Sequence, residues 1–79
     1  MSTEHMKKFR SDVGELKQHI ACLSVNDTFN KELNLISWYG AEPKYDIRTW
    51  TNDHSKMGKG ITLDAEELRT LKDVLNALF

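Results

Sequence analysis

The sequence predicts a small α+β domain in which strands of an antiparallel sheet precede one C-terminal amphipathic helix. The segment KYDIRTWT, residues 44–51, alternates between two kinds of side chain with the two-residue period of a strand that has unlike faces. The segment DAEELRTLKDVLNALF, residues 64–79, instead repeats leucine at the spacing of an amphipathic helix. This change of period along the chain places strands before the helix.

The composition indicates one folded domain and excludes several classes of protein. Seventy-nine residues expose so much surface that the domain's own core is thin, and a partner subunit would add stability. With 39% hydrophobic and 29% charged residues, the chain is too apolar for a disordered segment and has no apolar run that spans a membrane. The only cysteine, Cys22, excludes an intramolecular disulfide and a four-cysteine zinc site. The N-terminal residues lack the apolar segment of a secretory signal, so we expect a cytoplasmic protein.

The C-terminal helix has a well-specified start and one apolar stripe. Asp64 is in position to be the N-cap, and Glu67 three residues later completes a capping box. The stripe consists of Leu68, Leu71, Leu75 and Leu78. We expect these leucines to pack on the domain's own sheet, and any excess apolar surface to bind a symmetric partner.

Two strands lie ahead of this helix. In residues 44–51 we expect Tyr45 and Ile47 to face the core. The opposite face combines two cations, an indole and a carboxylate, which suits a wet or ligand-facing surface; it consists of Lys44, Asp46, Arg48 and Trp50. Residues 59–63, KGITL, predict a second short strand, and Gly58 and Gly60 permit close backbone approach or a positive φ.

The earlier part of the chain is less clear. LNLISWY, residues 33–39, is rich in strand formers and ends at a turn marked by Gly40 and Pro43, which predicts a hairpin with residues 44–51. Residues 6–23 carry apolar side chains at helical spacing. However, Gly14 interrupts that pattern and HIACLSV, residues 19–25, also suits a strand. The pattern alone leaves helix and strand open.

Cations and aromatic side chains gather in the middle of the chain, although the formal net charge is only -1. Lysine and arginine attract phosphates, and unpaired bases stack on aromatic rings. The candidate nucleic-acid-binding residues are Phe29, Lys31, Trp38, Lys44, Arg48, Trp50, Lys56 and Lys59. The cluster predicts binding of a single strand without sequence readout.

Structural roles are the alternative for several of these residues. Tryptophans in a small domain are often core residues, Arg48 can pair with Asp46, and Lys56 and Lys59 can be solvated loop charges.

Catalytic and metal-binding signals are weak. His54 beside Asp53 has no partnered nucleophile. The histidines and Cys22 match no zinc spacing, and GKG lacks the frame of a phosphate loop. We therefore expect no catalytic activity, no metal and no cofactor.

The segments DIRTW and KMGKGITLDAEELRTL resemble the transcriptional coactivator family called positive cofactor four, and its bacterial YdbC-like branch in particular. The resemblance covers residues 31–63 almost without interruption, continues through the helix to about residue 78, and includes residues 16–25 as a first strand. Residues 1–15 have no counterpart. We therefore expect an N-terminal extension, residues 1–15, which is helical or loose over residues 1–12, and a nucleic-acid-binding domain, residues 16–79.

The resemblance implies four antiparallel strands followed by a helix, assembled as a homodimer whose curved sheets bind single-stranded DNA, and RNA as a second ligand, with little sequence preference. Carried over by position, Arg48, Trp50 and Lys59 are the first candidates for this surface. The chain lacks the long Ser-rich and Lys-rich tail of the eukaryotic proteins, so a regulated coactivator activity is not implied. We expect a role in transcription, replication or repair, at the nucleoid if the protein is bacterial. The alternative is a protein-interaction module with a basic aromatic face.

Overall fold

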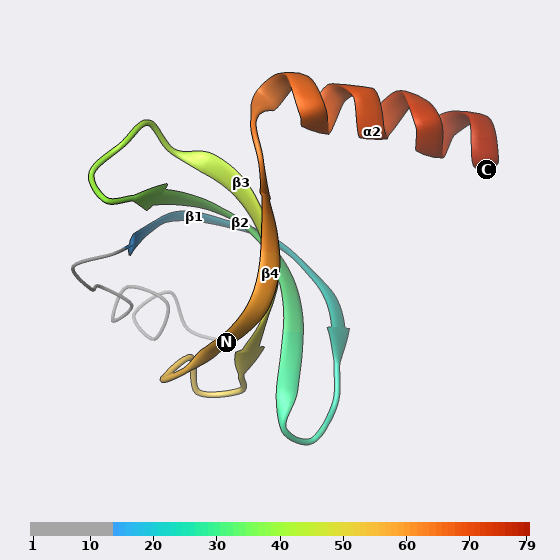
Figure 1. Ribbon diagram of the computed structural model, residues 1–79. Helices are drawn as coiled ribbons and strands as arrows, with labels where there is room; N and C mark the ends of the chain where they lie inside the picture. The colour runs from blue at the N-terminus through green and yellow to red at the C-terminus, as the bar shows by residue number, and fades with distance from the viewer. Residues whose placement is uncertain (1–13) are drawn as a thin grey trace.

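The computed structural model describes residues 14–79, which form one four-stranded sheet followed by one helix (Figure 1). The strands are β1 (Gly14–Val25), β2 (Phe29–Trp38), β3 (Lys44–Thr51) and β4 (Met57–Leu63), and the helix is α2 (Ala65–Leu78). Neighbours along the chain pair antiparallel in the order β1-β2-β3-β4. The predicted fold class is confirmed. Nearly all of the predicted N-terminal extension lies outside the described residues.

Strand β1 includes residues 14–23 of the ambiguous segment, and the rest of that segment, residues 6–13, lies outside the described residues. The pairing of β1 explains why residues 14–23 resemble a helical stripe. Its register with β2 shifts between Leu16 and Gln18, between His19 and Ala21, and between Cys22 and Ser24. Each shift inserts one extra residue, so three residues of β1 oppose two of β2, as in repeated β-bulges. Side chains of such a strand repeat about every three residues instead of every two. Apolar residues at that spacing are hard to distinguish from a helical stripe.

The predicted hairpin between β2 and β3 is confirmed, and it closes through a two-residue turn. The amide of Ala41 donates to the carbonyl of Trp38 at 2.9 Å. Between them, Tyr39 has a φ of 53° and Gly40 a φ of 73°. Two positive φ values are what a type I′ turn requires, and this turn matches the twist of the two strands that it joins.

Strands β3 and β4 pair through a close approach of their backbones. Close approach was one of the two roles expected for Gly58 and Gly60, and a positive φ was the other. A Cβ atom at Gly60 would overlap Cβ of Arg48 and the carbonyl of Ile47, and one at Gly58 would overlap the Thr49 hydroxyl. Neither glycine has a positive φ. Glycine therefore lets β4 lie directly against β3.

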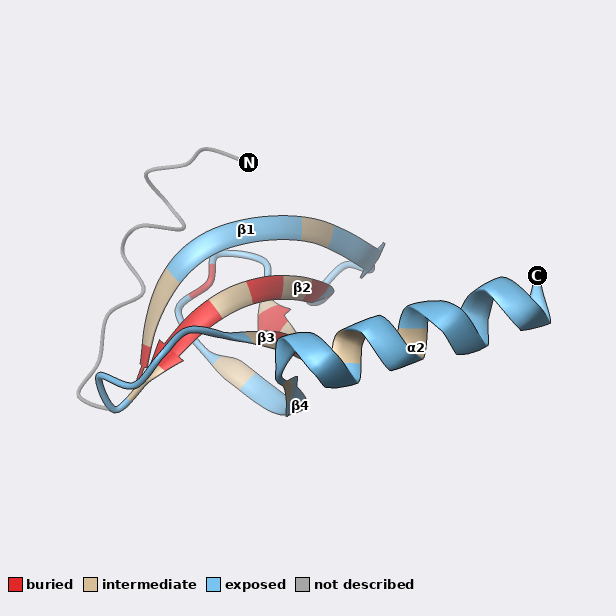
Figure 2. Ribbon diagram, turned by 90° about the horizontal axis from the view of Figure 1, so that it is seen from above, coloured by how far each residue is buried: buried red, intermediate tan, exposed pale blue. Residues whose placement is uncertain are grey.

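The two faces of the sheet are buried in the opposite sense to the prediction. Figure 2 shows buried positions along β2 and β3. Asp46 is 0% and Trp50 1% exposed, whereas Tyr45 and Ile47 are only half-buried. On β2, buried side chains alternate with half-buried or exposed ones at Asn30, Glu32, Asn34 and Ile36, and Ser37 beyond them is also buried. We call the face with the four alternating residues, Asp46 and Trp50 the inner face. The expectation of a wet face on β3 is wrong because its polar groups bind one another there.

Helix α2 begins as predicted but covers little of the sheet. The Asp64 carboxylate accepts from the amide of Glu67 at 2.8 Å, and the Glu67 carboxylate accepts from the amide of Asp64 at 2.9 Å. The helix extends away from the end of β4 and contains no buried residue (Figures 1 and 2). The expectation that its leucines form a core with the domain's own sheet is therefore not met within one chain. Among residues 14–79, no helix is long and apolar enough to cross a membrane.

Candidate nucleic-acid interface

One end of the sheet, which we call the tip end, carries the β1–β2 turn and the β3–β4 loop side by side (Figure 1). The turn is held by Asn26, whose side-chain oxygen accepts from the amides of Thr28 at 2.9 Å and Phe29 at 2.7 Å. The backbone amide of Asn52 in the loop donates to the carbonyl of Thr28 at 3.2 Å. The two connections therefore support each other instead of projecting separately.

The β3–β4 loop is closed by its own short polar side chains. The carboxylate of Asp53 accepts from the Thr51 hydroxyl at 2.8 Å and from the amide and hydroxyl of Ser55 at 2.9 and 2.7 Å. The amide of Thr51 donates to the carbonyl of Lys56 at 2.9 Å, and the amide of Lys56 donates to the Thr51 hydroxyl at 3.1 Å. These bonds order the backbone from which Lys56 projects.

Four of the predicted binding residues lie at or near the tip end. Phe29 is 44% exposed at the start of β2, and the other three residues of this tip cluster, Lys31, Lys56 and Lys59, are exposed. Phe29 lies opposite Thr51 and Lys31 opposite Thr49 on β3. None of the three lysines forms an ion pair with a carboxylate of residues 14–79. Their charges are therefore available to an anionic ligand.

A buried carboxylate lies on the inner face beneath this cluster. Glu32 is 0% exposed and accepts hydrogen bonds from the side-chain amides of Asn30 and Asn34, both at 3.2 Å. Its third partner is Nε2 of His54 at 2.8 Å. Burial alone would raise the pKa of Glu32, but the hydrogen bonds from Asn34, His54 and Asn30, with the charge of His54, outweigh it and hold the pKa below 4.5.

Arg48 is engaged within the chain. Its Nε and Nη2 atoms donate to the two carboxylate oxygens of Asp46 at 2.6 and 2.7 Å, and its guanidinium carbon lies 4.8 Å from the centre of the Trp38 ring. The Arg48 side chain is 14% exposed and that of Asp46 is 0% exposed. The geometry matches the alternative in which Arg48 pairs with Asp46. A phosphate would have to compete with a bidentate carboxylate for this cation.

Trp50 lies in the core, as its structural alternative predicted. The side chain packs beside His54, with ring centroids 5.6 Å apart. At 1% exposure the ring offers no face for a base to stack on. Trp38 is half-buried beneath Arg48. The aromatic surface of this sheet is therefore not made by its tryptophans.

The remaining predicted residue, Lys44, is exposed at the start of β3, at the end of the sheet opposite the tip cluster. Near it, Tyr39 in the β2–β3 turn is 78% exposed, and sequence reasoning did not select it. The signal was an aromatic residue directly before Gly40, a position that a two-residue turn pushes out of the sheet. Within residues 14–79, no group of three histidine, cysteine, aspartate or glutamate residues has a metal-binding arrangement.

Comparison with known proteins gives two matches. The family model described as Transcriptional Coactivator p15 (PC4) matches residues 25–74, which is more than half of the chain. An uncharacterized protein of Treponema pallidum (strain Nichols) is 55% identical over 47 residues, covering 60% of this chain. The aligned residues are 55% of that protein, so the match spans only about half of its length.

Proposed function

The chain belongs to the transcriptional coactivator p15 (PC4) family, and on this basis we propose that it is a homodimeric protein that binds single-stranded DNA with little sequence preference. Membership of the family suggests single-stranded DNA binding and transcription coactivation by a domain that is not an enzyme. The proposal extends this to the YdbC-like branch, to RNA as a second ligand, and to a role in transcription, replication or repair at the nucleoid.

The observation that carries the proposal is the tip cluster, where three exposed lysines, none paired with a carboxylate of residues 14–79, lie toward the same end of the sheet as an exposed aromatic ring. Lysines neutralise phosphates and release counterions, so each contact adds affinity without reading sequence. Phe29 supplies a ring on which one unpaired base stacks, and such stacking contributes about 1 to 3 kcal/mol. Duplex DNA keeps its bases stacked within the helix, so it gains only the electrostatic part.

Lys44 and Tyr39 form a second contact area at the other end of the same strands. Tyr39 is more exposed than Phe29, and the two rings lie at opposite ends of β2. Lys44 pairs with Ile36 on the inner-face side of the sheet, whereas Phe29 and Lys31 pair with Thr51 and Thr49 on the other side, so the two areas are separate contacts. Arg48 and Trp38 lie between these areas and act mainly by holding the inner face in shape.

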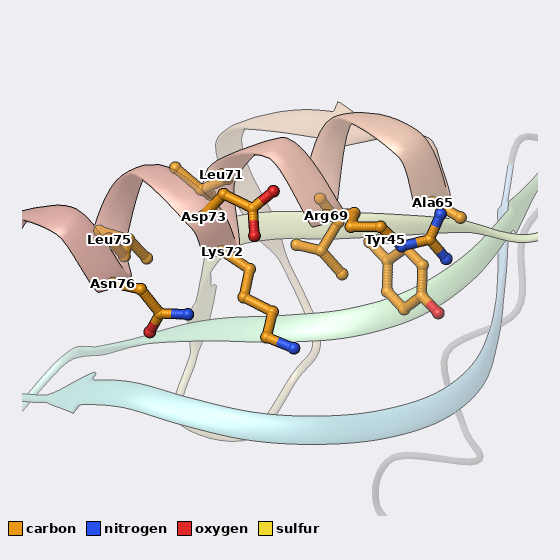
Figure 3. A pocket seen from close by; sticks show the side chains of 9 residues that line it. Tyr45, Ala65, Arg69, Leu71, Lys72, Asp73, Leu75 and Asn76 are labelled. Atoms are coloured by element: carbon orange, nitrogen blue, oxygen red, sulfur yellow. The ribbon is translucent and has the colours of Figure 1, made fainter.

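The homodimer is proposed from the apolar surface that one chain leaves uncovered. A groove of about 620 Å³ runs along α2 (Figure 3). Its apolar lining comes from Tyr45 of β3 and from Leu68, Leu71 and Leu75, and Arg69, Lys72 and Asp73 also line it. Ile61 on β4 is 57% and Leu78 on α2 is 71% exposed. A thin core and an exposed apolar stripe are together typical of a chain that is completed by a second copy.

The second candidate is a protein-interaction module whose basic aromatic face docks an acidic partner. The same lysines favour it, because charge alone does not distinguish phosphates from carboxylates. What separates the two is stacking: an acidic peptide has no bases for Phe29 or Tyr39. A discriminating variant must change these exposed residues, since Arg48 and Trp50 are structural.

The test is competition against a labelled oligo-dT strand by unlabelled oligo-dT, oligo-U and poly-glutamate of equal charge. The proposal expects oligo-dT to compete far better than poly-glutamate, and the Phe29→Ala variant to lose most of that preference. RNA is a real ligand if oligo-U competes within about tenfold of oligo-dT, which corresponds to about 1.4 kcal/mol. Equal competition by poly-glutamate would favour the acidic-protein partner.

A further inference from the structure

We infer that Glu32 and His54 form a positioning pair, in which the buried carboxylate holds the β3–β4 loop so that Lys56 and Lys59 are presented for phosphate binding. The inference rests on the proposed function, because it assigns a role to two residues that touch no ligand themselves. Neither residue belongs to the exposed tip cluster. Both lie beneath it, on the inner side of the sheet.

The conformation of His54 requires an external restraint. Its φ is 61°, in the left-handed region that residues other than glycine adopt only at a cost in free energy. The amide of His54 donates to the carbonyl of Thr51 at 2.8 Å, which shapes the turn but leaves the ring unconstrained. The ring is nonetheless buried, with a residue exposure of 5%. The ring packs beside Trp50, and its bond to Glu32 is the hydrogen bond that connects it to β2.

The Glu32 carboxylate is also held by residues outside the loop. Amides from Asn30 and Asn34 bind Glu32 along the same strand, one on each carboxylate oxygen. Because an ionised carboxylate only accepts hydrogen bonds, Nε2 of His54 carries the proton in the 2.8 Å contact. A loop residue is thereby tied to the middle of β2, across 22 positions of the chain.

The bond between Glu32 and His54 affects the lysines through the backbone of the β3–β4 loop. Lys56 follows His54 by two residues, and its amide and carbonyl both bind Thr51, which precedes the loop. Lys59 lies on β4, the strand that begins where this loop ends. Asn52 also links the loop to β2, through its side-chain contact with Asn30 at 2.8 Å. If the His54 ring leaves the inner face, the loop loses the one of these links that lies nearer to Lys56, and the ammonium groups of both lysines become less well placed. Positioning of this kind changes how many phosphates are neutralised, which a salt titration measures directly.

The test is a double-mutant cycle between His54→Ala and the paired variant Lys56→Ala/Lys59→Ala, read as oligo-dT affinity against salt concentration. Two lost phosphate contacts lower the salt slope by about 1.4 and the affinity about tenfold near 0.15 M salt. We expect His54→Ala to produce a similar loss, and the lysine substitutions to add little in the His54→Ala background. His54→Gln, whose amide can donate to Glu32, should restore most of the slope.

The matched control is His19→Ala. His19 belongs to the same network, with Nδ1 2.7 Å from the Asn34 oxygen and 3.6 Å from a carboxylate oxygen of Glu32, but it lies on β1, and these contacts within residues 14–79 go to β2 rather than to the loop. We expect its slope to equal that of the unaltered protein. If His54→Ala weakens binding additively with the lysine pair, or leaves the slope unchanged while folded, the positioning role is wrong. If His54→Ala does not fold, the decision rests on His54→Gln. A salt slope of His54→Gln that stays well below that of the unaltered protein overturns the positioning role. If the unaltered protein binds no oligo-dT, the proposed function itself fails and the positioning role falls with it.

Discussion

Arg48 and Asp46 form a bidentate pair inside the sheet, with Nε and Nη2 of the arginine 2.6 and 2.7 Å from the two carboxylate oxygens. The Asp46 oxygen that accepts from Nη2 also accepts from the Thr62 hydroxyl at 3.2 Å, so the pair joins β3 to β4. A buried pair of this kind contributes little relative to apolar residues, but its breakage leaves one charge without a partner. The two residues therefore stabilise the fold as a unit.

The first prediction concerns this pair. Asp46→Ala should lower the free energy of unfolding by about 3 to 5 kcal/mol, because it leaves the mostly buried guanidinium of Arg48 without its carboxylate partner. The control is Lys17→Ala, which breaks the exposed pair with Glu15 and should cost less than about 1 kcal/mol. Urea unfolding at one fixed protomer concentration measures both. Equal costs for the two variants would show that the Arg48–Asp46 pair is not a buried structural unit.

The second prediction separates core from contact aromatics. Phe29→Ala should weaken oligo-dT binding by about 1 to 3 kcal/mol without unfolding the protein, since it removes a stacking ring. Trp50→Ala should instead cost about 3 to 5 kcal/mol of stability, as large core truncations do. Phe79→Ala is the control, because Phe79 is 101% exposed beyond α2. Anisotropy of labelled oligo-dT and thermal unfolding give the two readings. The assignment fails if Phe29→Ala binds like the Phe79→Ala control.

The third prediction is a dependence of stability on pH. The pKa of Glu32 is lower in the folded chain than its usual value of 4.5, so near and below that pH the unfolded chain binds more protons than the folded one. The resulting stability is fully present above about pH 5 and is lost as the pH falls through the folded pKa. Glu32→Gln should be less stable than the unaltered protein at pH 7. Its free energy of unfolding should also fall less steeply than that of the unaltered protein between pH 5 and 3.

Urea unfolding at each pH measures this dependence. Glu42→Gln removes an exposed carboxylate from the β2–β3 turn and controls for the change in net charge. Its slope should match that of the unaltered protein. A Glu32→Gln variant that loses stability with acid as steeply as the parent would contradict the role given to this carboxylate.

The fourth prediction tests the dimer. Leu71→Glu places a charge in the apolar groove along α2 and should convert a dimer of 18.2 kDa, twice the 9.1 kDa chain, into monomers. Thr70→Glu adds the same charge on a helix face outside that groove and should leave the mass unchanged. Light scattering after size exclusion gives the mass directly. A monomeric parent protein, or a dimeric Leu71→Glu variant, would argue against this interface.

Much of the fold follows from local sequence signals, and its exceptions have physical causes. The Asp64 capping box and the β2–β3 turn depend on a few adjacent residues, so the sequence predicts them well. Strand β1 was ambiguous because its bulges repeat about every three residues, which only the register with β2 reveals. The prediction for the two faces of β3 is reversed, because the polar side chain of Asp46 can be buried when Arg48 is present as its hydrogen-bond partner. The alternation of KYDIRTWT places Asp46 and Arg48 on one face and so permits their pairing, but it does not indicate that this face is the buried one.

The candidate site shows the same division between local and tertiary information. The candidate lysines are exposed, as expected of a residue type that is rarely buried, and their binding role stays a prediction. The sequence predicts Phe29, Trp38 and Trp50 as aromatic contacts by residue type, whereas accessibility depends on which side of a curved sheet each ring occupies. Phe29 and Tyr39 are accessible because they lie at the two ends of β2. The pairing of Glu32 with His54 joins distant positions and has no local signature.

Equilibrium anisotropy of labelled oligo-dT and of the matching duplex, titrated with the protein at several salt concentrations, tests the central claim most directly. With three to four lysines on phosphates, we expect a slope of log affinity against log salt of about −2 to −3 for the single strand. At each salt concentration the single strand should bind more tightly than the duplex, because only unpaired bases stack on Phe29 and Tyr39. Binding that is equal for the two ligands, insensitive to salt, or absent would contradict a surface built to hold single-stranded DNA.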